Sequence, residues 1–322
     1  MSTAAPVQDE VSPTPSKPRR RRNRTATRRR IAVAVFMAPW AVGFLLFYLY
    51  PMVASLYFSF TQYDLLSQPR WTGLGNYSYM IHKDPSFWLA IRNTVWIVAI
   101  STPIQVIFAM STAMVLTRVQ GRGATIYRTI FFAPTMVPAV AATLGFLFLL
   151  NPQGPLDRLL GFLHLPHPLW FQDPHTAKPG LVLLALWGIG NTMIIFLAAL
   201  LDVPRSLYEA AEVEGASAWQ RFRFVTLPMI SPVIFFSLVI GVIYGFQYFT
   251  EAYVAAGGSG SLGDPQGSLL FYGVYLYQQG FAYFHMGYAS ALAWVLFVII
   301  MLWTLLLIWS SRRWVHYQGG LR

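Results

Sequence analysis

The chain has 322 residues, of which 56% are hydrophobic and only 11% are charged. Soluble domains usually carry about 25% charged residues, so this composition excludes an ordinary soluble fold and indicates a protein that crosses a membrane several times. The chain has no cysteine, which excludes disulfides, thiolate nucleophiles and cysteine-based zinc sites.

The net charge of +11 is concentrated near the N-terminus. Nine of the 23 Lys and Arg residues lie between Lys17 and Arg30, after a stretch rich in Pro, Ser and Thr. Such a segment buries little apolar surface, so residues 1–30 are predicted to be a disordered cytoplasmic tail. We interpret its charge as a topology signal that touches anionic lipid of the bilayer, and a nucleic-acid-binding arm is the weaker alternative.

Residues 31–322 are predicted to form an all-α, polytopic domain with six transmembrane helices. A helix of about 20 apolar residues crosses the hydrocarbon core of a bilayer. The apolar stretches of this length are 31–50, 87–116, 126–150, 180–201, 233–256 and 286–310. The first is long and lacks a clear small-residue cleavage site, so we expect an uncleaved helix instead of a signal peptide.

The placement of Lys and Arg predicts the orientation of these helices. With the N-terminus inside, 18 of the 23 basic residues fall on the inner side and five on the outer side. Because cytoplasmic segments carry the excess of Lys and Arg, both termini are predicted to be cytoplasmic. Residues 206–228 then lie in the cytoplasm between spans four and five, and the Pro-rich, aromatic segment 151–179 lies outside.

Motifs that carry catalysis are missing from the sequence. A Walker A motif needs a lysine that reaches the phosphates, and the lysines, Lys17, Lys83 and Lys178, lack that context. H-E-x-x-H and G-x-S-x-G are absent as well. We therefore expect no enzymatic activity, no catalytic residue and no cofactor bound by this chain.

The outer segment contains three histidines, His164, His167 and His175, close to Asp173. Imidazole and carboxylate groups are common metal ligands. The intervening prolines, however, force an extended chain and no two of the histidines are paired on one helix face. We expect an ordinary exposed loop here and no metal.

Glu251 is the one acidic residue that lies clearly within a predicted span. Acidic residues at membrane depth are costly and usually face a cavity or a partner. Two interpretations remain open: Glu251 contacts a substrate, or it reaches the outer interface or pairs within an assembly.

Aromatic and polar residues near Glu251 suit the apolar patches and hydroxyls of a sugar. Tyr244, Gln247 and Tyr248 precede it in span five, and Trp187 and Asn191 lie in span four. An amide inside a membrane needs a hydrogen-bond partner, which is either a neighbouring helix or the substrate. These residues are therefore candidates for a substrate pathway, although ordinary helix packing explains any single one of them.

Residues 206–228 are far more polar than their surroundings. Ser206 and Glu209 have the spacing of a capping box, and Gly215 is expected to end the short helix that follows. Trp219 and Phe222 then share one face of a second helical turn. Leu227-Pro228 and Ser231-Pro232 are expected to break the backbone before span five.

The predicted shape is a compact helix–turn–helix on the cytoplasmic face, which suits insertion into a groove on a partner. The alternative is an amphipathic segment lying on lipid. Three glutamates between positions 209 and 214 argue against it, because the inner leaflet is anionic and surface helices are usually basic.

The same run resembles the E-A-A-x-x-x-G coupling motif of binding-protein-dependent ABC importer permeases. The matching residues are Glu209-Ala210-Ala211, Gly215 and Leu227-Pro228. Further similarities are L-F-Y-L-Y-P at 46–51, G-L-G-N-Y at 73–77, A-P-T-M-V-P at 133–138 and the glycine-rich segment 255–267. The resemblance covers nearly the whole chain from residue 31 onward and is strongest to the carbohydrate-importing, MalF-like and UgpA-like branch.

The resemblance implies a sugar or oligosaccharide permease subunit in a bacterial plasma membrane. It implies as partners a second permease subunit, two copies of an ATPase that bind ATP and Mg, and an outer solute-binding protein. The residues expected to couple to the ATPase are Glu209, Ala210, Ala211, Glu214, Gly215, Leu227 and Pro228.

Two departures from the family pattern are present. Glu214 stands where Asp is most frequent, and Ala-Ala-Gly-Gly-Ser replaces Thr-Gly-Gly-Gly-Pro after span five. A permease for another solute, such as glycerol phosphate, is the main alternative. An ion-coupled secondary transporter is more distant, because it should carry several acidic residues within its spans.

Overall fold

A computed structural model describes residues 24–119, 121–257 and 263–316 of the chain. Most of the predicted tail therefore lies outside the described residues, as does the middle of the glycine-rich segment. The chain forms two compact units, Met1–Ala54 and Ser55–Arg322.

The first unit consists of α1 (Arg24–Phe44), the π-helical turn η1 (Leu45–Leu49) and the start of α2 (Tyr50–Ser59). Together they give a helical stretch from Arg28 to Ser59 that is long and apolar enough to span a membrane. Trp40 stacks on Phe44 at 5.6 Å, and Phe44 stacks on Tyr48 at 6.2 Å between ring centroids. The predicted first span, 31–50, lies within this helix, which continues beyond it.

The described part of the second unit contains one short antiparallel pair of strands, β1 (Thr61–Gln62) and β2 (Arg70–Trp71), and otherwise consists of helices and their connecting loops. Its helices up to the predicted cytoplasmic loop are α3 (Gly75–His82), α4 (Pro85–Thr117), α5 (Arg122–Phe132), η2 (Ala133–Met136), α6 (Ala139–Leu149), α7 (Pro155–Phe162), α8 (Pro174–Trp187) and α9 (Gly190–Leu201). The remaining helices are α10 (Arg205–Val213), α11 (Ala218–Arg221), η3 (Phe222–Thr226), α12 (Leu227–Phe246), α13 (Thr250–Ala256), α14 (Tyr272–Tyr277), η4 (Gln278–Ala282) and α15 (Met286–Ser311).

The described residues contain four to six candidate membrane spans. The four long apolar helices are Arg28–Ser59, Pro85–Thr117, Ala218–Phe246 and Met286–Ser311. Two bent pairs raise the number to six if each pair is one span: Gly123–Met136 with Ala139–Leu149, and Pro174–Trp187 with Gly190–Leu201.

The segments predicted as spans three and four, 126–150 and 180–201, are each a bent pair of helices. The third bends by 101° between η2 and α6, where Pro138 lacks the N–H that would continue the helix. The fourth bends by 51° between α8 and α9. At that bend an added Cβ on Gly190 would lie 2.6 Å from the carbonyl oxygen of Phe131, so the end of α5 approaches α9 at backbone distance.

The predicted bounds of span five, 233–256, are also wrong. The apolar helix begins at Ala218 and ends at Phe246, and α13 is a separate short helix. The break follows from close packing on α14, because an added Cβ on Gly273 would lie 3.0 Å from the carbonyl oxygen of Tyr248. Phe249 also packs its ring on Tyr277 at 5.3 Å. Glu251 therefore lies outside the long helix.

Helix α12 packs closely on α4 through two glycines spaced four residues apart. A Cβ added to Gly241 would lie 2.5 Å from Cγ2 of Thr102, and one on Gly245 would lie 2.9 Å from Cγ2 of Val98. Small residues at this spacing let two membrane helices approach at backbone distance. Helices α4 and α12 both contribute to two apolar core clusters, one that contains Phe271 and Tyr272 and one that contains Phe196 and Ile230.

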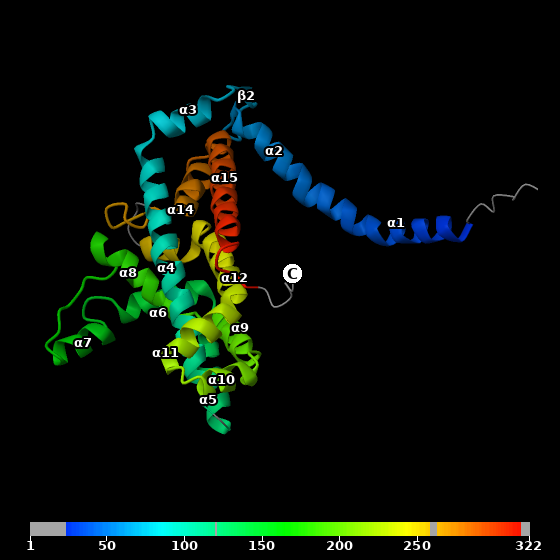
Figure 1. Cartoon of the computed structure of the whole chain (residues 1–322). Helices are drawn as coiled ribbons and strands as arrows, with labels where there is room; N and C mark the ends of the chain where they lie inside the picture. The colour runs from blue at the N-terminus through cyan, green and yellow to red at the C-terminus, as the bar shows by residue number, and fades with distance from the viewer. Residues whose placement is uncertain (1–23, 120, 258–262, 317–322) are drawn as a thin grey trace, which may run out of the picture. The chain divides into compact units, whose positions relative to one another are not determined.

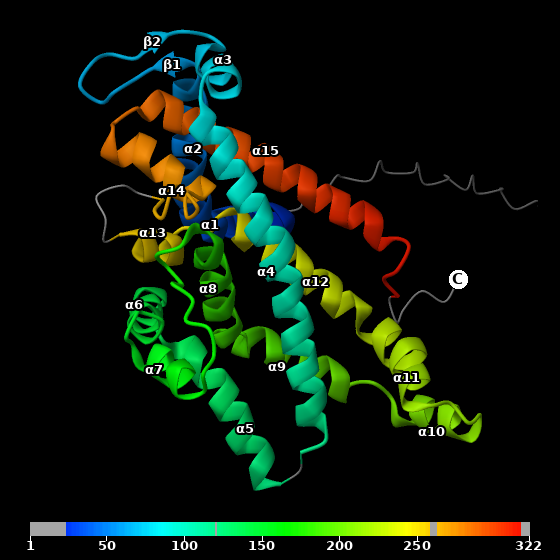
Figure 2. The ribbon, with the colours of Figure 1, turned by 90° about the vertical axis from the view of Figure 1, so that its left-hand side faces the viewer.

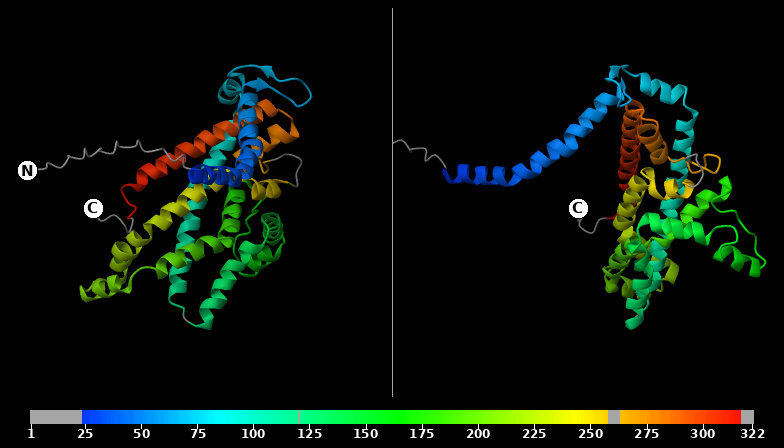
Figure 3. Two further views of the ribbon diagram at one scale, coloured as in Figure 1. Left: turned by 90° about the vertical axis from the view of Figure 1, so that its right-hand side faces the viewer. Right: turned by 180° about the vertical axis from the view of Figure 1, so that it is seen from behind.

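The polar loops occupy different parts of the second unit. Figures 1 and 2 show α10 and α11 at the end opposite β1, β2 and α3. Helices α6 and α7 and the loop to α8 lie on one flank, and Figure 2 shows α7 well separated from α10 and α11. The reverse view in Figure 3 shows the same separation of the flank from α12 and α15.

Candidate functional site

Helix α10 ends at a glycine-terminated cap that determines the turn of the predicted coupling loop. Gly215 has φ +76°, a conformation that glycine adopts at little cost. The Gly215 N–H donates to Glu212 at 3.0 Å, and the Ala216 N–H donates to Ala211 at 2.9 Å. These two bonds form a Schellman motif and confirm that Gly215 ends the helix.

The predicted capping box at Ser206 is wrong. Pro204 is the N-cap of α10, so Ser206 lies inside the first helical turn. The capping box is instead at α11, where the Ser217 side chain accepts from the Gln220 N–H at 3.3 Å and the Gln220 side chain accepts from the Ser217 N–H at 2.7 Å. Both segments satisfy the S-x-x-E/Q pattern. Only Ser217 stands at the N-cap of its helix, because α10 already begins after Pro204.

The predicted backbone break at Pro228 is also wrong. Helix α11, the π-helical turn η3 and α12 form one continuous helical stretch from Ala218 to Phe246. Pro228 lies in the first turn of α12, within that stretch. Because η3 closes its backbone bonds one residue wider than an α-helix, the chain accommodates the proline and stays helical.

Two side-chain contacts tie α10 to this long helix. The Tyr208 hydroxyl shares a 2.9 Å hydrogen bond with the hydroxyl of Thr226, which is buried. Arg221 forms an ion pair with Glu212. The loop is therefore linked to the membrane helix both covalently and across the turn.

The exposed surface of the loop carries large apolar side chains. Val213 is 90% exposed and Trp219 is 69% exposed. Trp219 packs on Phe222 at 5.5 Å between ring centroids, which confirms the predicted common face. Of the residues predicted to couple to an ATPase, Glu209, Ala210, Glu214 and Gly215 are exposed, whereas Ala211, Leu227 and Pro228 are partly buried.

The substrate candidates of span four flank the bend between α8 and α9. Trp187 is the last residue of α8 and is 40% exposed. Asn191 is exposed in the first turn of α9. The ring of Trp187 contacts Phe146 of α6 at 5.6 Å.

The remaining candidates lie at the end of α12 and in α13. Tyr244 is 70% exposed, and the Gln247 amide donates to the carbonyl of Ile243 at 3.2 Å. Tyr248 packs edge-on against Phe271 at 5.5 Å, and Glu251 is partly exposed. Within the described part of the chain, no hydrogen bond or ring contact joins these residues to Trp187 and Asn191 of span four. Helix α6 separates the two groups, because it packs on α13 on one side and contacts Trp187 on the other.

Two buried polar clusters were missed in the sequence analysis. The Lys178 amine donates to Asn93 Oδ1 at 2.7 Å, and the Asn93 amide donates to the carbonyls of Gly267 and Leu270 at 2.8 and 3.0 Å. The Asp84 carboxylate caps α4 and accepts hydrogen bonds from Tyr275 and Tyr288. Their partners lie about 85 to 200 residues apart in sequence, so no local pattern reveals them.

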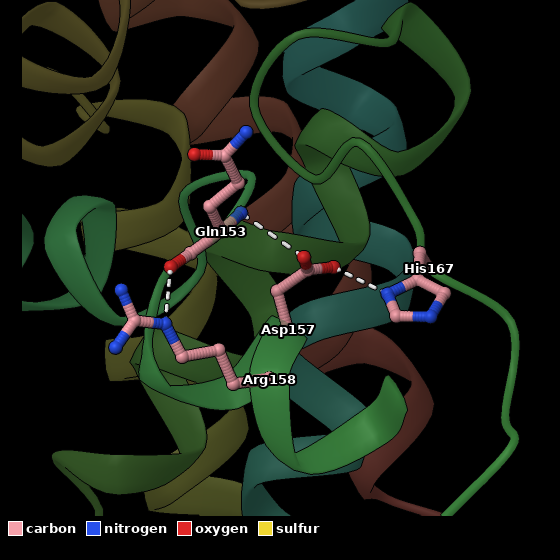
Figure 4. A network of polar contacts seen from close by, with 4 residues as sticks. All are labelled: Gln153, Asp157, Arg158 and His167. Carbon is pink, nitrogen blue, oxygen red and sulfur yellow. Dashed lines mark hydrogen bonds and ion pairs between the residues drawn. The ribbon is translucent and has the colours of Figure 1, made fainter. Parts of the chain in front are cut away.

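The outer loop is held by a small polar network. Figure 4 shows Asp157 between Gln153 and His167, with one carboxylate oxygen directed toward each. The distances are 2.8 Å to His167 Nδ1 and 3.0 Å to the Gln153 N–H. The hydrogen bond with His167 has the larger effect, and together with that from the Gln153 N–H it holds the pKa of Asp157 below its ordinary value. Within residues 24–119, 121–257 and 263–316, no three His, Cys, Asp or Glu side chains form a group that could hold a metal.

An apolar helical bundle joined to an exposed helix–turn–helix defines this chain as a multi-pass membrane subunit. Residues 105–316 match the family described as binding-protein-dependent transport system inner membrane component. The chain belongs to this family, which confirms the resemblance carried by residues 209–228. The protein is therefore a multi-pass inner-membrane component of a transport system, in a family of translocating subunits and not of enzymes.

Several relatives extend over nearly the whole chain. The chain is 41% identical to the probable ABC transporter permease protein YesP of Bacillus subtilis, over 90% of this chain and 93% of the relative. It is 33% identical to the arabinooligosaccharides transport system permease protein AraP of the same species, over 86% and 88%. The lactose transport system permease protein LacF of Rhizobium radiobacter is 31% identical, over 86% and 93%.

The fold matches a solved transporter structure. A chain of a bacterial ABC transporter involved in the import of the acidic polysaccharide alginate superposes with a TM-score of 0.78. The match covers 90% of this chain and 98% of that chain, at 23% sequence identity. The arrangement of helices is thus that of an ABC importer permease.

Proposed function

We propose that the protein is the permease subunit of an ATP-driven importer for a sugar or oligosaccharide. The relatives AraP and LacF, which are named for the transport of arabinooligosaccharides and lactose, support the substrate class. The family description supports a binding-protein-dependent system and leaves the ion-coupled secondary transporter without support. A non-sugar solute such as glycerol phosphate is the competing substrate.

The observation that carries the mechanism is the continuous helix from Ala218 to Phe246. Its first turns bear the exposed Trp219, and α10 is tied to it through Tyr208 and Glu212. An ATPase that grips this loop would move α12 directly, so closure of the ATPase would tilt the span and change access to the pathway. In this proposal Glu209, Ala210, Ala211, Glu214, Gly215, Leu227 and Pro228 couple to the ATPase.

The working assembly contains further subunits in this proposal. A second permease completes the pathway, two ATPase chains bind ATP and Mg, and an outer solute-binding protein delivers the sugar. This chain contributes six spans from residues 31–322, with each bent pair counted as one span. The Lys and Arg distribution supports a cytoplasmic location for both termini and for residues 206–228. The candidates for the substrate pathway are Trp187, Asn191, Tyr244, Gln247, Tyr248 and Glu251.

The substitution Gly215→Asp tests the coupling assignment. Gly215 has φ +76° and open space around it, so the aspartate strains the turn without a side-chain clash. We expect sugar uptake to fall to background while the protein still inserts in the membrane. Glu209→Lys, which reverses a charge on the exposed face, should have the same effect.

Gly121→Asp is the matched control. Gly121 has φ +65° and equally open surroundings, in the turn between α4 and α5 that is predicted to be cytoplasmic as well. It adds the same charge at a positive-φ glycine, and with ψ −147° its backbone strain is at least as large. Because it does not touch the coupling loop, uptake should stay near wild type. Normal uptake and ATPase binding in Gly215→Asp would refute the assignment, and so would an equal loss in both variants.

A further inference from the structure

We propose that a cavity between α6, α13 and the loop before α8 is a subsite for one sugar ring on the side of the protein predicted to face outward. The proposal rests on the proposed sugar-import function. It assigns a binding role to residues outside the predicted pathway, namely Phe148, Asn151, Phe171 and Gln172. The solute would occupy this site before it reaches the candidates in spans four and five.

The cavity has the size and lining of a small-molecule site. Its volume is about 390 Å³, within the usual range of about 300–1,000 Å³. The walls are mostly apolar, with the aromatic rings of Phe148 and Phe171, and they carry the two amides of Asn151 and Gln172. Aromatic rings accept the apolar face of a sugar, and amides supply both a donor and an acceptor for its hydroxyls.

Both amides are available for a ligand. In the described part of the chain, Asn151 and Gln172 make hydrogen bonds only through their backbones, at 2.7 Å from the Gly154 N–H to the Asn151 carbonyl and 2.9 Å from the Gln172 N–H to the Leu169 carbonyl. Their side chains are exposed at the cavity. This differs from Gln220 and Gln247, whose amides are used within the fold.

The loop wall of the cavity is held in place by three contacts. The Phe171 ring lies against Gly180 of α8, where an added Cβ would be 3.0 Å from the ring. The Thr176 hydroxyl donates to the Trp170 carbonyl at 2.8 Å. The His167–Asp157 contact shown in Figure 4 anchors the preceding residues to α7. The Phe171 ring and the Gln172 amide therefore lie on a segment that is already held in place, which lowers the entropic cost of ordering them on binding.

The opposite wall connects the cavity to Glu251. Val254 and Ala255 line the cavity from α13. Residues three and four apart share one face of a helix, so Glu251 lies on the same face, one turn toward the start of α13. Glu251 itself does not line the cavity, so in this proposal a sugar that leaves the subsite along α13 meets this carboxylate next. This order keeps Glu251 among the substrate candidates.

Because the natural chain has no cysteine, thiol labelling can report occupancy of the cavity. Gln172→Cys places a thiol on the loop wall, and Val254→Cys places one on the α13 wall if the first variant fails to insert. Gln62→Cys, exposed on β1 away from the cavity, is the control. The complete transporter with its binding protein is reconstituted in nanodiscs. Labelling with a methanethiosulfonate reagent is followed with and without saccharide.

The saccharide is chosen by its ability to stimulate ATP hydrolysis by the wild-type complex. The panel contains lactose, arabinotriose, an alginate pentasaccharide and other di- to pentasaccharides of pentoses, hexoses and uronic acids. At ten times its half-saturating concentration, the active saccharide should slow labelling at position 172 about tenfold and leave position 62 unchanged. Asn151→Leu and Gln172→Leu should each raise the half-saturating concentration about tenfold, and Gln62→Leu should not.

The outcomes separate this subsite from the proposed function. A saccharide that stimulates ATP hydrolysis without slowing labelling at position 172 overturns the subsite and leaves the sugar importer intact. A wild-type complex that no saccharide of the panel stimulates overturns both. A thiol that reacts in the isolated chain but is unreactive in the complex, with or without saccharide, shows that another subunit covers the cavity, and this also overturns the subsite.

Discussion

The two polar loops of the second unit hold their shapes by different means. Residues 206–228 continue directly into α12, and their turn is closed by a Schellman motif and by the Tyr208–Thr226 hydrogen bond. Residues 151–179 contain the short helix α7, which packs on α6, and the loop after it is held by the His167–Asp157 contact and by Phe171 against Gly180. The first loop continues into a membrane helix through the backbone, whereas the second is held mainly by side-chain contacts.

The difference matches two mechanical tasks. A loop that receives force from an ATPase must not bend, because bending would absorb the movement before it reached the membrane. A loop that forms the wall of an entrance transmits no force, so a few surface side-chain contacts are enough to hold it. Disturbing the first loop should therefore abolish transport, and disturbing the second should change only its concentration dependence or its dynamics.

The largest effect is expected from two glycines inserted between Phe222 and Arg223, inside η3. Two glycines destabilise a helix by about 2 kcal/mol and make the joint flexible. We expect the ATPase to bind the complex while sugar uptake in proteoliposomes falls to background. The same insertion after Gly121, in the α4–α5 turn, serves as the control and should leave most uptake intact. Unchanged uptake with the glycines in η3 would show that continuity of this helix is not needed.

A moderate effect is expected from Gly180→Leu. The new side chain meets the Phe171 ring, which already lies 3.0 Å from the position of a Cβ, and pushes it into the cavity. Overpacking of this kind costs about 1–3 kcal/mol, so the half-saturating sugar concentration should rise about tenfold with an unchanged maximal rate. Gly145→Leu on α6, where an added Cβ meets open space, is the control. A fall in maximal rate without a change in half-saturation would contradict the assignment of Phe171 to the entrance.

The smallest effect is expected from loss of the His167–Asp157 contact in the outer loop. The pKa of Asp157 is lowered from 3.8, first by the hydrogen bond of His167 and then by that of the Gln153 N–H. A lowered carboxyl pKa stabilises the folded loop above this value, and the stabilisation is lost as the pH falls below it. A nitroxide attached through Leu165→Cys should therefore be more mobile at about pH 3 than at about pH 7 in its electron paramagnetic resonance spectrum.

The same label with His167→Ala completes this test. Without the imidazole the loop should be mobile at both pH values, while uptake at neutral pH changes less than twofold or so. Equal mobility of the label in the presence and absence of His167 would mean that the contact does not hold the loop.

Much of the architecture follows from local sequence patterns. Apolar stretches of membrane length identify the helices, and Gly215 ends α10 because only a residue tolerant of positive φ fits the cap. Trp219 and Phe222 meet because residues three apart share a helix face. These features depend on neighbours within a few positions, which one sequence displays directly.

Other features depend on residues far away in the chain. Helix α12 ends at Phe246 because the segment after it packs on Gly273 and Phe271, more than 20 positions later. The cavity combines the end of α6, the loop before α8 and α13, and none of these carries a recognisable motif. The pairing of Lys178 with Asn93 joins α8 to α4. Sequence periodicity describes single elements, so it does not predict contacts of this kind.

The continuous helix from Ala218 to Phe246 is longer than a membrane span requires. At about 1.5 Å per residue, its 29 residues measure about 43 Å, against a hydrocarbon core of about 30 Å. In the proposed mechanism this excess would act as a lever arm beyond the hydrocarbon core, with Trp219 near one tip and Tyr244 near the other. When a rigid rod pivots inside the membrane, a push on one tip produces an opposite displacement of the other, scaled by the ratio of the two arms. One element would then convert a shift at the ATPase into a simultaneous shift at the opposite end of the span, with no intermediate step.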